Sequence, residues 1–580
     1  MRFKRIRRVK DETGGLNRFI LLFSITLIFF LAGVARLFDL QVIRGSYFQA
    51  LAEGNRIRRI PIKAPRGEIL DRNGEVLARN IPRYNAAKFS TGGVITDLAE
   101  ISREDAFKIQ TEENDSTSLI VDVSREYPLG AAAAHLLGYV NEASSEEKDK
   151  EIVCPKEQES SYARVYEIGD LVGRGGIEEQ YECILRGVNG EELVEVDARG
   201  RVVRSIGRKE PIAGQSIKLS IDAKLQRVSF EALEDAPNEL GTGPLRESGG
   251  VVRGAVVATD PKTGEVLVLV SAPSYDPSTI GSNYEQLLKD ENQPLINRAI
   301  GGIYPPGSTY KIVTSTAGLE EGVINRDTKF EDKGFISVGS YTYRNWFYTQ
   351  YGRVEGEINI VKAITRSTDT FFYKVGEDLG VDRLVNWSKK LGLGEKTKID
   401  LPREAGGLVP DPTWKEKVQG ERWYLGNTYH MSIGQGDLLV TPLQVNMMTS
   451  VIANGGRLCE PKVLKVVQVE HVVQEKCKDL GIKEETFQLI KEGMVGACST
   501  GGTAYPLFTF KPQVACKTGT AQFSTDPSTG SGHWKTHAWL TAFAPVESPA
   551  LVVTALVEGG GEGSRVAAPV VKRVLQASFE

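Results

Sequence analysis

Residues 304–314 read Y-P-P-G-S-T-Y-K-I-V-T, and the interpretation of the remaining chain depends on this stretch. A helix is predicted from its middle to about Glu321, because Gly322 stops the helical pattern. Ser308 and Lys311 are three residues apart, so both side chains lie on one face of that helix. A serine hydroxyl is a weak nucleophile until a base removes its proton, and a partly desolvated lysine can act as that base. Ser308 also lies at the predicted helix start, where backbone amides favour developing negative charge.

This S-x-x-K pattern is weak when taken alone. S-E-E-K at 145–148 matches it as well, inside an acidic loop where a solvated surface explains it. K-T-G occurs twice, at Lys262 in a predicted turn and at Lys517 on a predicted strand. The pattern S-x-D is commoner still and occurs at Ser220, Ser274, Ser367 and Ser524. Only the order, spacing and local context of the matches can separate function from chance.

One ordered set combines all three patterns: S-T-Y-K at 308–311, S-T-D at 367–369 in a predicted helical run, and K-T-G-T at 517–520. This trio resembles the active site of penicilloyl serine transferases, the family of penicillin-binding proteins. Many relatives carry asparagine where this chain has Asp369, and an aspartate there is similar to the elongation-type class B enzymes, often called penicillin-binding protein 2. The segment W-Y-L-G-N-T-Y-H at 423–430 resembles the same type. The alternative is that Asp369 only caps a helix or pairs locally.

The resemblance implies a catalytic role for five residues. Ser308 would be the nucleophile that forms an acyl-enzyme, and Lys311 would be its general base. Ser367 would relay protons to the leaving or attacking amine. The implied catalytic set is Ser308, Lys311, Ser367, Asp369 and Lys517.

The resemblance also implies a substrate-binding strand. Lys517 and Thr518 would hold the terminal carboxylate of the substrate, a task that suits a fixed cation and a hydroxyl. Gly519 would let the substrate backbone lie against the strand as an added β-pairing. The backbone amides of Ser308 and Thr520 would form the oxyanion hole.

The fold class implied by the resemblance is α/β in α+β layers, the penicilloyl serine transferase fold, with an antiparallel sheet flanked by helices. The sequence pattern itself predicts a β-hairpin from 255–259 and 265–271, joined by the turn D-P-K-T-G. Helical segments follow, and a second β region closes the chain. The elements predicted there are strands at 514–521, 537–545 and 550–558 and a helix at 567–579.

Near the N-terminus, residues 19–35 carry no charge and are bracketed by two arginines whose long stems can reach the polar surface of a bilayer. Six basic residues precede them. The positive-inside rule therefore predicts a cytoplasmic basic tail at 1–18, a transmembrane helix at 19–40 and an exported remainder. We expect a single-pass protein of the bacterial cytoplasmic (inner) membrane. A cleaved signal peptide is the alternative, because 33–35 weakly resembles a cleavage site.

Residues 41–225 are charged and irregular and lack a catalytic constellation, so we expect an N-terminal pedestal or dimerisation domain there. The transpeptidase, or penicillin-binding, domain is expected at 226–580. No glycosyltransferase domain precedes the pedestal, which excludes the bifunctional class A arrangement. Further stretches resemble the same family and extend the resemblance over nearly the whole chain: 66–74, 173–182, 194–204 and 432–444.

Charge and cysteine content limit the partners and cofactors. The formal net charge of the 580-residue chain is only −4, so nucleic acid is not an expected partner. The six cysteines form no C-x-x-C pair and no metal-ligand cluster with the five histidines, so we expect no metal and no cofactor. Free buried thiols are predicted for them, with a disulfide between Cys459 and Cys477 as the alternative.

The reaction implied by the resemblance is peptidoglycan D,D-transpeptidation during cell-wall elongation. Ser308 would attack the D-alanyl-D-alanine carbonyl of a stem peptide, release D-alanine and pass the acyl group to a neighbouring amine. β-Lactams would acylate Ser308 as substrate mimics. The implied partners are stem peptides, β-lactams, the cytoplasmic membrane, a glycosyltransferase of the shape, elongation, division and sporulation (SEDS) family, and other elongation-complex proteins.

Two other functions could use the same residues. A D,D-carboxypeptidase or β-lactamase would resolve the acyl-enzyme with water, but no E-x-x-x-N of the class A β-lactamase kind follows Asp369. A non-enzymatic β-lactam sensor would need a signalling region, and only about eighteen residues precede the membrane segment. An inert scaffold would have no need of the complete trio.

Overall fold

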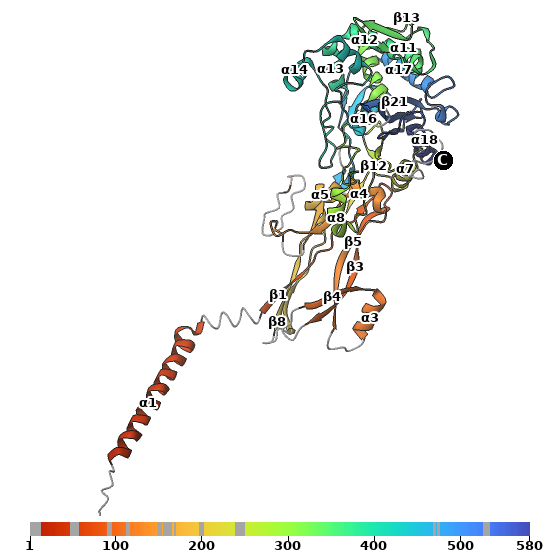
Figure 1. Ribbon diagram of the computed structural model, residues 1–580. Helices are drawn as coiled ribbons and strands as arrows, with labels where there is room; N and C mark the ends of the chain where they lie inside the picture. The colour runs from red at the N-terminus through yellow and green to blue at the C-terminus, as the bar shows by residue number, and fades with distance from the viewer. Residues whose placement is uncertain are drawn as a thin grey trace, which may run out of the picture. The chain divides into compact units, whose positions relative to one another are not determined.

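The computed structural model describes residues 13–46, 57–89, 95–111, 117–147, 154, 165–166, 170–196, 202–237, 250–467, 471–472, 476–525 and 534–580 (Figure 1). The chain divides into two compact units. The first contains Met1–Lys63, Pro82–Asp122 and Asn189–Ile212. The second contains Ala64–Ile81, Val123–Val188 and Ala213–Glu580.

The first unit begins with an apolar helix. α1 (Thr13–Phe38) continues into a short π-helical turn (Asp39–Ile43). Within the described ranges, Arg18–Ile43 is the one helical span long and apolar enough to cross a membrane. The phenylalanine and leucine side chains from Phe19 to Phe38 are exposed, as a lipid-facing helix requires. The basic residues on which the predicted orientation rests lie at 2–10, outside the described residues.

The remaining described elements of the first unit are mostly strands. A three-stranded antiparallel sheet contains, in spatial order, β1 (Ile57–Ile62), β8 (Gly190–Val196) and β9 (Val202–Lys209). The last residues of β3 (Val76–Phe89) pair with β4 (Ile95–Ile101), and α3 (Arg103–Thr111) follows β4.

The second unit is built on a five-stranded antiparallel sheet. Its strands are, in spatial order, β12 (Val266–Ala272), β11 (Gly254–Thr259), β23 (Leu551–Val557), β22 (Trp534–Ala544) and β21 (Ala515–Thr525). The predicted hairpin thus joins the three strands predicted near the C-terminus, and the predicted layered fold is confirmed. β21 is an edge strand of this sheet, so one side of its backbone faces no other strand of the sheet.

Helices pack against both faces of the sheet, because successive side chains along each strand point to opposite faces. In β22, Leu540 contacts the core that contains α7 (Ala223–Glu234) and α18 (Ala567–Phe579), which lie side by side (Figure 1). Trp539 and Phe543 join the opposite core. This two-residue alternation is the side-chain period of a strand. The helix predicted at 567–579 is confirmed as α18.

The core around Trp539 contains most of the helices of the second unit. The helices from the nucleophile candidate to the last strands are α9 (Lys311–Glu320), α10 (Trp346–Tyr351), α11 (Ile360–Arg366), α12 (Asp369–Leu379), α13 (Val381–Lys390), α14 (Pro412–Gln419), α15 (Leu425–Ser432), α16 (Pro442–Ala453) and α17 (Glu484–Ala497). α8 (Ile280–Lys289) precedes them.

Short strand pairs also belong to the second unit. They are β6 (Tyr139–Glu142) with β7 (Leu171–Arg174), β13 (Phe330–Asp332) with β16 (Gly356–Ile358), β14 (Phe335–Val338) with β15 (Tyr341–Arg344), and β17 (Arg457–Cys459) with β20 (Cys477–Asp479). A further set joins β2 (Ile69–Leu70), β10 (Ile217–Leu219), β18 (Leu464–Val467) and β19 (His471–Val472).

The R-G-E-I-L-D-R-N-G and G-R-G-G-I-E-E-Q-Y-E stretches meet in a buried ion-pair network. Arg66 Nε lies 2.6 Å from Glu178 Oε2, and Arg66 Nη2 lies 2.5 Å from Glu182 Oε2. Arg125 Nε lies 2.8 Å from Glu178 Oε1. Burial by itself raises the pKa of Glu178, but the charges of Arg66 and Arg125 lower it overall. These two stretches therefore act in packing, since removing one partner would leave an uncompensated buried charge.

The prediction of free thiols is wrong, because all six cysteines are paired. The disulfides join Cys154 with Cys183, Cys459 with Cys477, and Cys498 with Cys516. The alternative pairing of Cys459 with Cys477 is confirmed. These two residues are opposite each other in the register of β17 and β20, a proximity that depends on strand pairing and not on sequence spacing alone.

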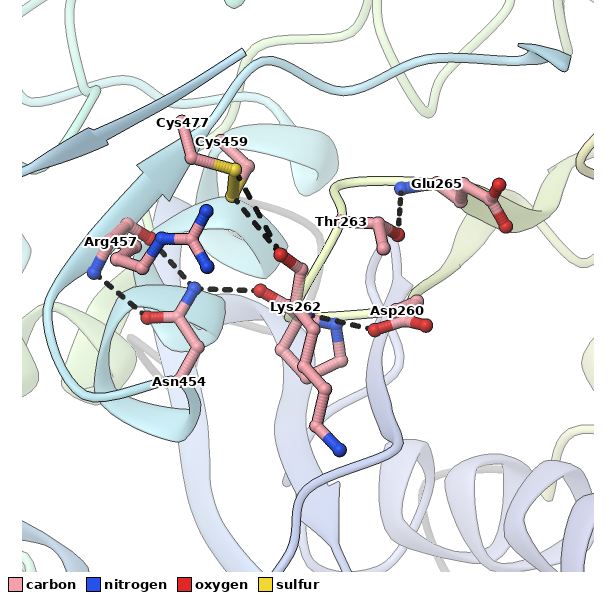
Figure 2. The surroundings of a disulfide bond; sticks show 9 residues. Asp260, Lys262, Thr263, Glu265, Asn454, Arg457, Cys459 and Cys477 are labelled. Atoms are coloured by element: carbon pink, nitrogen blue, oxygen red, sulfur yellow. Dashed lines mark hydrogen bonds between the residues drawn. A yellow bond between two sulfur atoms is a disulfide. The ribbon is translucent and has the colours of Figure 1, made fainter. Parts of the chain in front are cut away.

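Figure 2 shows the Cys459–Cys477 disulfide beside the first K-T-G segment. Its two sulfur atoms lie 3.7 and 3.9 Å from the backbone oxygen of Lys262. Asn454 Nδ2 donates hydrogen bonds to Pro261 O and Arg457 O. The Lys262 segment is therefore the turn between β11 and β12, as predicted, and a disulfide and an asparagine hold it.

Candidate active site

Ser308 lies on a tight turn that introduces α9. Residues Gly307–Tyr310 form a 3₁₀ turn, so the predicted helix is confirmed except for its first turn. Gly307 has a φ of +53°, and its N–H donates to Gly434 O at 2.8 Å. A Cβ on Gly434 would lie 2.1 Å from Gly307 O, so no side chain fits there. The stretch S-I-G-Q-G-D, recognised only as a family resemblance, thus fixes the turn that carries Ser308.

Lys311 is fully buried one turn after Ser308. Its Nζ donates to Ser367 O at 2.8 Å, to Ser367 Oγ at 3.1 Å and to Asp369 Oδ1 at 2.6 Å. Burial lowers the pKa of Lys311, and the Asp369 carboxylate offsets only part of that effect. A lysine in this environment gives up its proton more readily than one in water.

Ser367 interrupts the helical run that was predicted through it. It follows α11 in the left-handed conformation, with a φ of +55°, and α12 starts two residues later at Asp369. A non-glycine residue in this conformation costs of order 1 kcal/mol. The prediction of a continuous helix is wrong here, because the break turns the Ser367 hydroxyl toward the two lysines.

Lys517 reaches the same hydroxyl from β21. Its fully buried Nζ donates to Ser367 Oγ at 2.9 Å and to Thr518 O at 3.0 Å. Burial and the nearby charge of Lys311 lower the pKa of Lys517 well below its usual value, against the attraction of Asp369. Asp369 is therefore the one carboxylate that attracts both buried lysines. Two positive charges beside one negative charge favour loss of a proton from the lysine pair.

Asp369 pairs with more than its own helix. Its Oδ1 accepts from Lys311, and its Oδ2 accepts from the N–H of Trp346 at 3.0 Å. The N–H of Asp369 donates to Asn345 Oδ1 at 3.2 Å, and Asn345 Nδ2 donates to the buried Asp332. Sequence patterns gave no sign of Asn345 or Asp332, which come from the segment before α11.

The substrate-binding set lies on the edge strand β21, beside the turn of Ser308. A Cβ on Gly307 would lie 2.9 Å from Thr520 O. A Cβ on Gly519 would lie 2.9 Å from Trp539 Cβ and 3.1 Å from Pro306 O, so only glycine fits between the nucleophile turn and β22. Gln435 Nε2 donates to Thr520 O at 3.3 Å.

The structure therefore brings the three patterns of the ordered set together. Lys311 and Lys517 both donate to the Ser367 hydroxyl, and Ser308 follows Gly307 in the turn that lies against Thr520. The competing matches lie elsewhere: Ser220 donates to Val266 O, and Lys262 is in a surface turn. Within the described ranges, no group of three or more histidine, cysteine, aspartate or glutamate side chains is arranged to hold a metal ion.

The fold and this arrangement define a serine acyltransferase of the penicillin-binding class. Residues 254–576 match the family model of the penicillin binding protein transpeptidase domain, and 88–219 match that of the penicillin-binding protein dimerisation domain. The chain belongs to the penicillin-binding protein transpeptidase family.

Curated and solved relatives refine the class. The peptidoglycan D,D-transpeptidase MrdA of Escherichia coli K12 is 34% identical, over 92% of this chain and 89% of that protein. A chain in a solved peptidoglycan synthase complex that coordinates polymerization and crosslinking is 33% identical, with a TM-score of 0.76 over 98% of this chain and 99% of that one. Penicillin-binding protein 2 of Helicobacter pylori, solved with MreC, is 28% identical, with a TM-score of 0.72 over 90% and 98%. The resemblance to penicillin-binding protein 2 is confirmed, and the chain is a peptidoglycan D,D-transpeptidase.

Proposed function

We propose that Ser308 forms the acyl-enzyme of this transpeptidase, with protons moved by Lys311 and Ser367. One observation carries the proposal: the Ser367 hydroxyl accepts hydrogen bonds from both Lys311 and Lys517. A hydroxyl between two lysines of lowered pKa can pass a proton from one nitrogen to an amine outside the pair. Asp369 keeps Lys311 oriented and stabilises its protonated form.

In the acylation step, neutral Lys311 accepts the proton of the Ser308 hydroxyl. Ser308 Oγ then forms a bond to the carbonyl carbon of the penultimate D-alanine. The negative charge on the carbonyl oxygen is stabilised by the backbone N–H groups of Ser308 and Thr520. When the intermediate collapses, the C–N bond breaks, and Ser367 delivers a proton from the lysine pair to the departing D-alanine nitrogen.

The second step reverses the proton path. The amine of a neighbouring stem peptide attacks the ester carbonyl and loses a proton to Lys311 through Ser367. The bond to Ser308 Oγ breaks, and Oγ takes back a proton. A β-lactam enters the first step in the same way, but its opened ring keeps the leaving nitrogen attached, so the ester persists.

Lys517 and Thr518 hold the terminal carboxylate of the donor peptide. An incoming carboxylate raises the pKa of the buried Lys517 and makes its positive charge favourable. The open edge of β21 receives the peptide backbone as an added strand, and Gly519 keeps this edge close to the Ser308 turn. This geometry would hold the scissile bond beside Ser308.

The proposed location is the outer face of the cytoplasmic membrane, with residues 1–18 in the cytoplasm and 19–40 as the anchor. The proposed pedestal covers 41–225 and the transpeptidase domain 226–580. The apolar helix α1 supports the anchor. Three disulfides support an oxidising compartment for the rest of the chain.

The proposed partners are a SEDS-family glycosyltransferase and other proteins of the elongation complex. Support comes from relatives of similar length, one in a complex that coordinates polymerization and crosslinking and one with MreC. The proposed donor and acceptor are peptidoglycan stem peptides.

Mass spectrometry of the penicillin adduct tests the nucleophile. The wild-type protein should carry one adduct on the peptide that contains Ser308, and Ser308→Ala should carry none. Ser145→Ala, in the competing S-x-x-K match, is the matched control and should be labelled fully. An adduct on another residue of the Ser308→Ala protein would contradict the proposal.

A further inference from the structure

The loop that connects α17 with the following 3₁₀ turn reaches both the second and the third motif. Residues 498–504 read C-S-T-G-G-T-A, and we refer to them as the 498–504 loop. It belongs to none of the patterns that pointed to the active site. Its contacts make it a neighbour of both Ser367 and Thr518.

Two separate contacts hold the 498–504 loop to the active-site motifs. Cys498, at the end of α17, forms a disulfide with Cys516, the residue before Lys517 on β21. Arg366, the residue before Ser367, donates from Nη1 to Gly501 O at 2.7 Å. The loop is therefore tied covalently to the strand of the third motif and by a charged hydrogen bond to the second.

The loop also has a fixed internal conformation. The N–H of Ala504 donates to Ala497 O at 2.9 Å, and the N–H of Gly502 donates to Ser499 O at 2.8 Å. A Cβ on Gly502 would lie 2.2 Å from Gly496 O, so the loop packs against the last turn of α17 without space for a side chain. A loop held in this way can present a side chain in one position.

Thr503 is the side chain that the loop presents to the substrate-binding strand. Its Oγ1 lies 2.8 Å from Thr518 Oγ1, and either hydroxyl can be the donor. A hydroxyl has one hydrogen to donate. If Thr518 gives its hydrogen to a bound carboxylate, Thr503 must be the donor within the pair. The order Thr503 to Thr518 to carboxylate is then a chain in which each hydrogen bond strengthens the next.

We propose that Thr503 is a positioning residue for carboxylate recognition, acting through Thr518 from the clamped 498–504 loop. The inference rests on the proposed function of Thr518. In the intact pair the Thr503 hydroxyl donates to Thr518 Oγ1 and leaves the Thr518 hydrogen to the carboxylate. Without the Thr503 hydroxyl, Thr518 Oγ1 loses that donor, and the direction of its own hydrogen toward the carboxylate is no longer fixed. Thr503 thereby contributes to the selection of substrates that end in a free carboxylate.

The test compares a penicillin with the methyl ester of its carboxylate. The readout is carboxylate discrimination, defined as the ratio of the second-order acylation rate constants of the free acid and the ester. Thr503→Val removes the hydroxyl at nearly constant volume, and Thr503→Ser keeps it. Thr486→Val is the matched control, since Thr486 is buried in the first turn of α17 and its hydroxyl donates to Glu320, on a different element.

We expect Thr503→Val to lower the discrimination by about 5-fold, the usual size of one hydrogen bond, mainly through weaker binding of the free acid. Thr503→Ser and Thr486→Val should keep it. The double variant Thr503→Val/Thr518→Val should discriminate no worse than Thr518→Val, because both changes break one chain. Equal losses for acid and ester in Thr503→Val would indicate a purely structural role and overturn the inference.

Thr518→Val separates the two levels of the proposal. If it lowers the discrimination and Thr503→Val does not, the positioning role of Thr503 is wrong and the role of Thr518 stands. If Thr518→Val leaves the discrimination unchanged, carboxylate binding by Thr518 is wrong, and the inference falls with it.

Discussion

The sequence K-T-G occurs twice in this protein, and each copy lies next to a disulfide that closes a sequence separation of 18. At the first copy, the exposed Lys262 turns the chain between β11 and β12, and its backbone oxygen faces the Cys459–Cys477 disulfide (Figure 2). At the second, Lys517 is fully buried and its Nζ contacts Ser367. The same three residues thus serve a turn in one place and an active site in the other.

The difference lies in what surrounds the lysine. Among the described residues, the one hydrogen-bond partner of Lys262 Nζ is Ser548 Oγ, at 3.5 Å, and the Lys262 side chain is exposed to water. The Lys517 side chain is shielded from water, and a second buried lysine, Lys311, contacts the same Ser367 hydroxyl. The second K-T-G copy is therefore chemically active because its lysine is buried and because Lys517 and Lys311 meet at one hydroxyl. Both conditions depend on the fold and not on the three-residue pattern.

The largest contrast is expected when each lysine is removed. Lys517→Ala should lower the rate of acylation by penicillin roughly 100-fold, because a charged hydrogen bond to the carboxylate and the partner of Ser367 are both lost. Lys262→Ala should be acylated by penicillin at the wild-type rate. Stopped-flow quenching of tryptophan fluorescence measures both rates. Similar rates for the two variants would remove Lys517 from the site.

The two disulfides offer a second matched pair. Each double cysteine-to-alanine variant should lose about 3 kcal/mol of unfolding free energy, because the closed loops have equal length. Only Cys498→Ala/Cys516→Ala should also acylate more slowly, by about 10-fold, since Cys516 precedes Lys517 and Cys498 starts the 498–504 loop. Denaturant titration and acylation kinetics separate the two effects. Slower acylation in Cys459→Ala/Cys477→Ala would contradict the assignment of that disulfide to the turn.

Much of this contrast could be predicted from the sequence, and the features that could not be predicted were missed for physical reasons. The strands around Lys517, the turn at Lys262 and the helix after Ser308 follow from local periodicity and turn residues. The left-handed Ser367 did not, because helical propensity is local and carries no information about the two lysines, distant along the chain, that contact Ser367. The cysteine pairs were missed, apart from Cys459–Cys477 as an alternative, since they depend on pairing of distant elements. Thr503 carries no pattern at all, and only the packing of α17 reveals it.

The pH dependence of stability tests the burial of Lys517, the lysine of the second K-T-G copy. The pKa of Lys517 in the folded protein lies below its value in the unfolded chain, so the unfolded chain binds more protons between these two values. Stability therefore rises with pH through this window and stops rising above the unfolded pKa near 10.5, by up to about 1.4 kcal/mol per pH unit for one proton. Lys517→Met should flatten this rise compared with the wild-type protein. Denaturant titrations at several pH values between 7 and about 10 measure it; a rise in Lys517→Met as steep as in the wild-type protein would contradict the lowered pKa.

The smallest effect is expected at Asn454, which binds the Lys262 turn to the end of α16. Its Oδ1 accepts from the N–H of Arg457 at 2.9 Å, and its Nδ2 donates to Pro261 O and Arg457 O. Asn454→Ala removes these hydrogen bonds at a partly exposed position and should cost about 1 kcal/mol of unfolding free energy. The acylation rate should not change, because no described contact joins Asn454 to the active-site residues. A slower acylation rate in Asn454→Ala would show that the conformation of the first K-T-G segment affects the active site that contains the second.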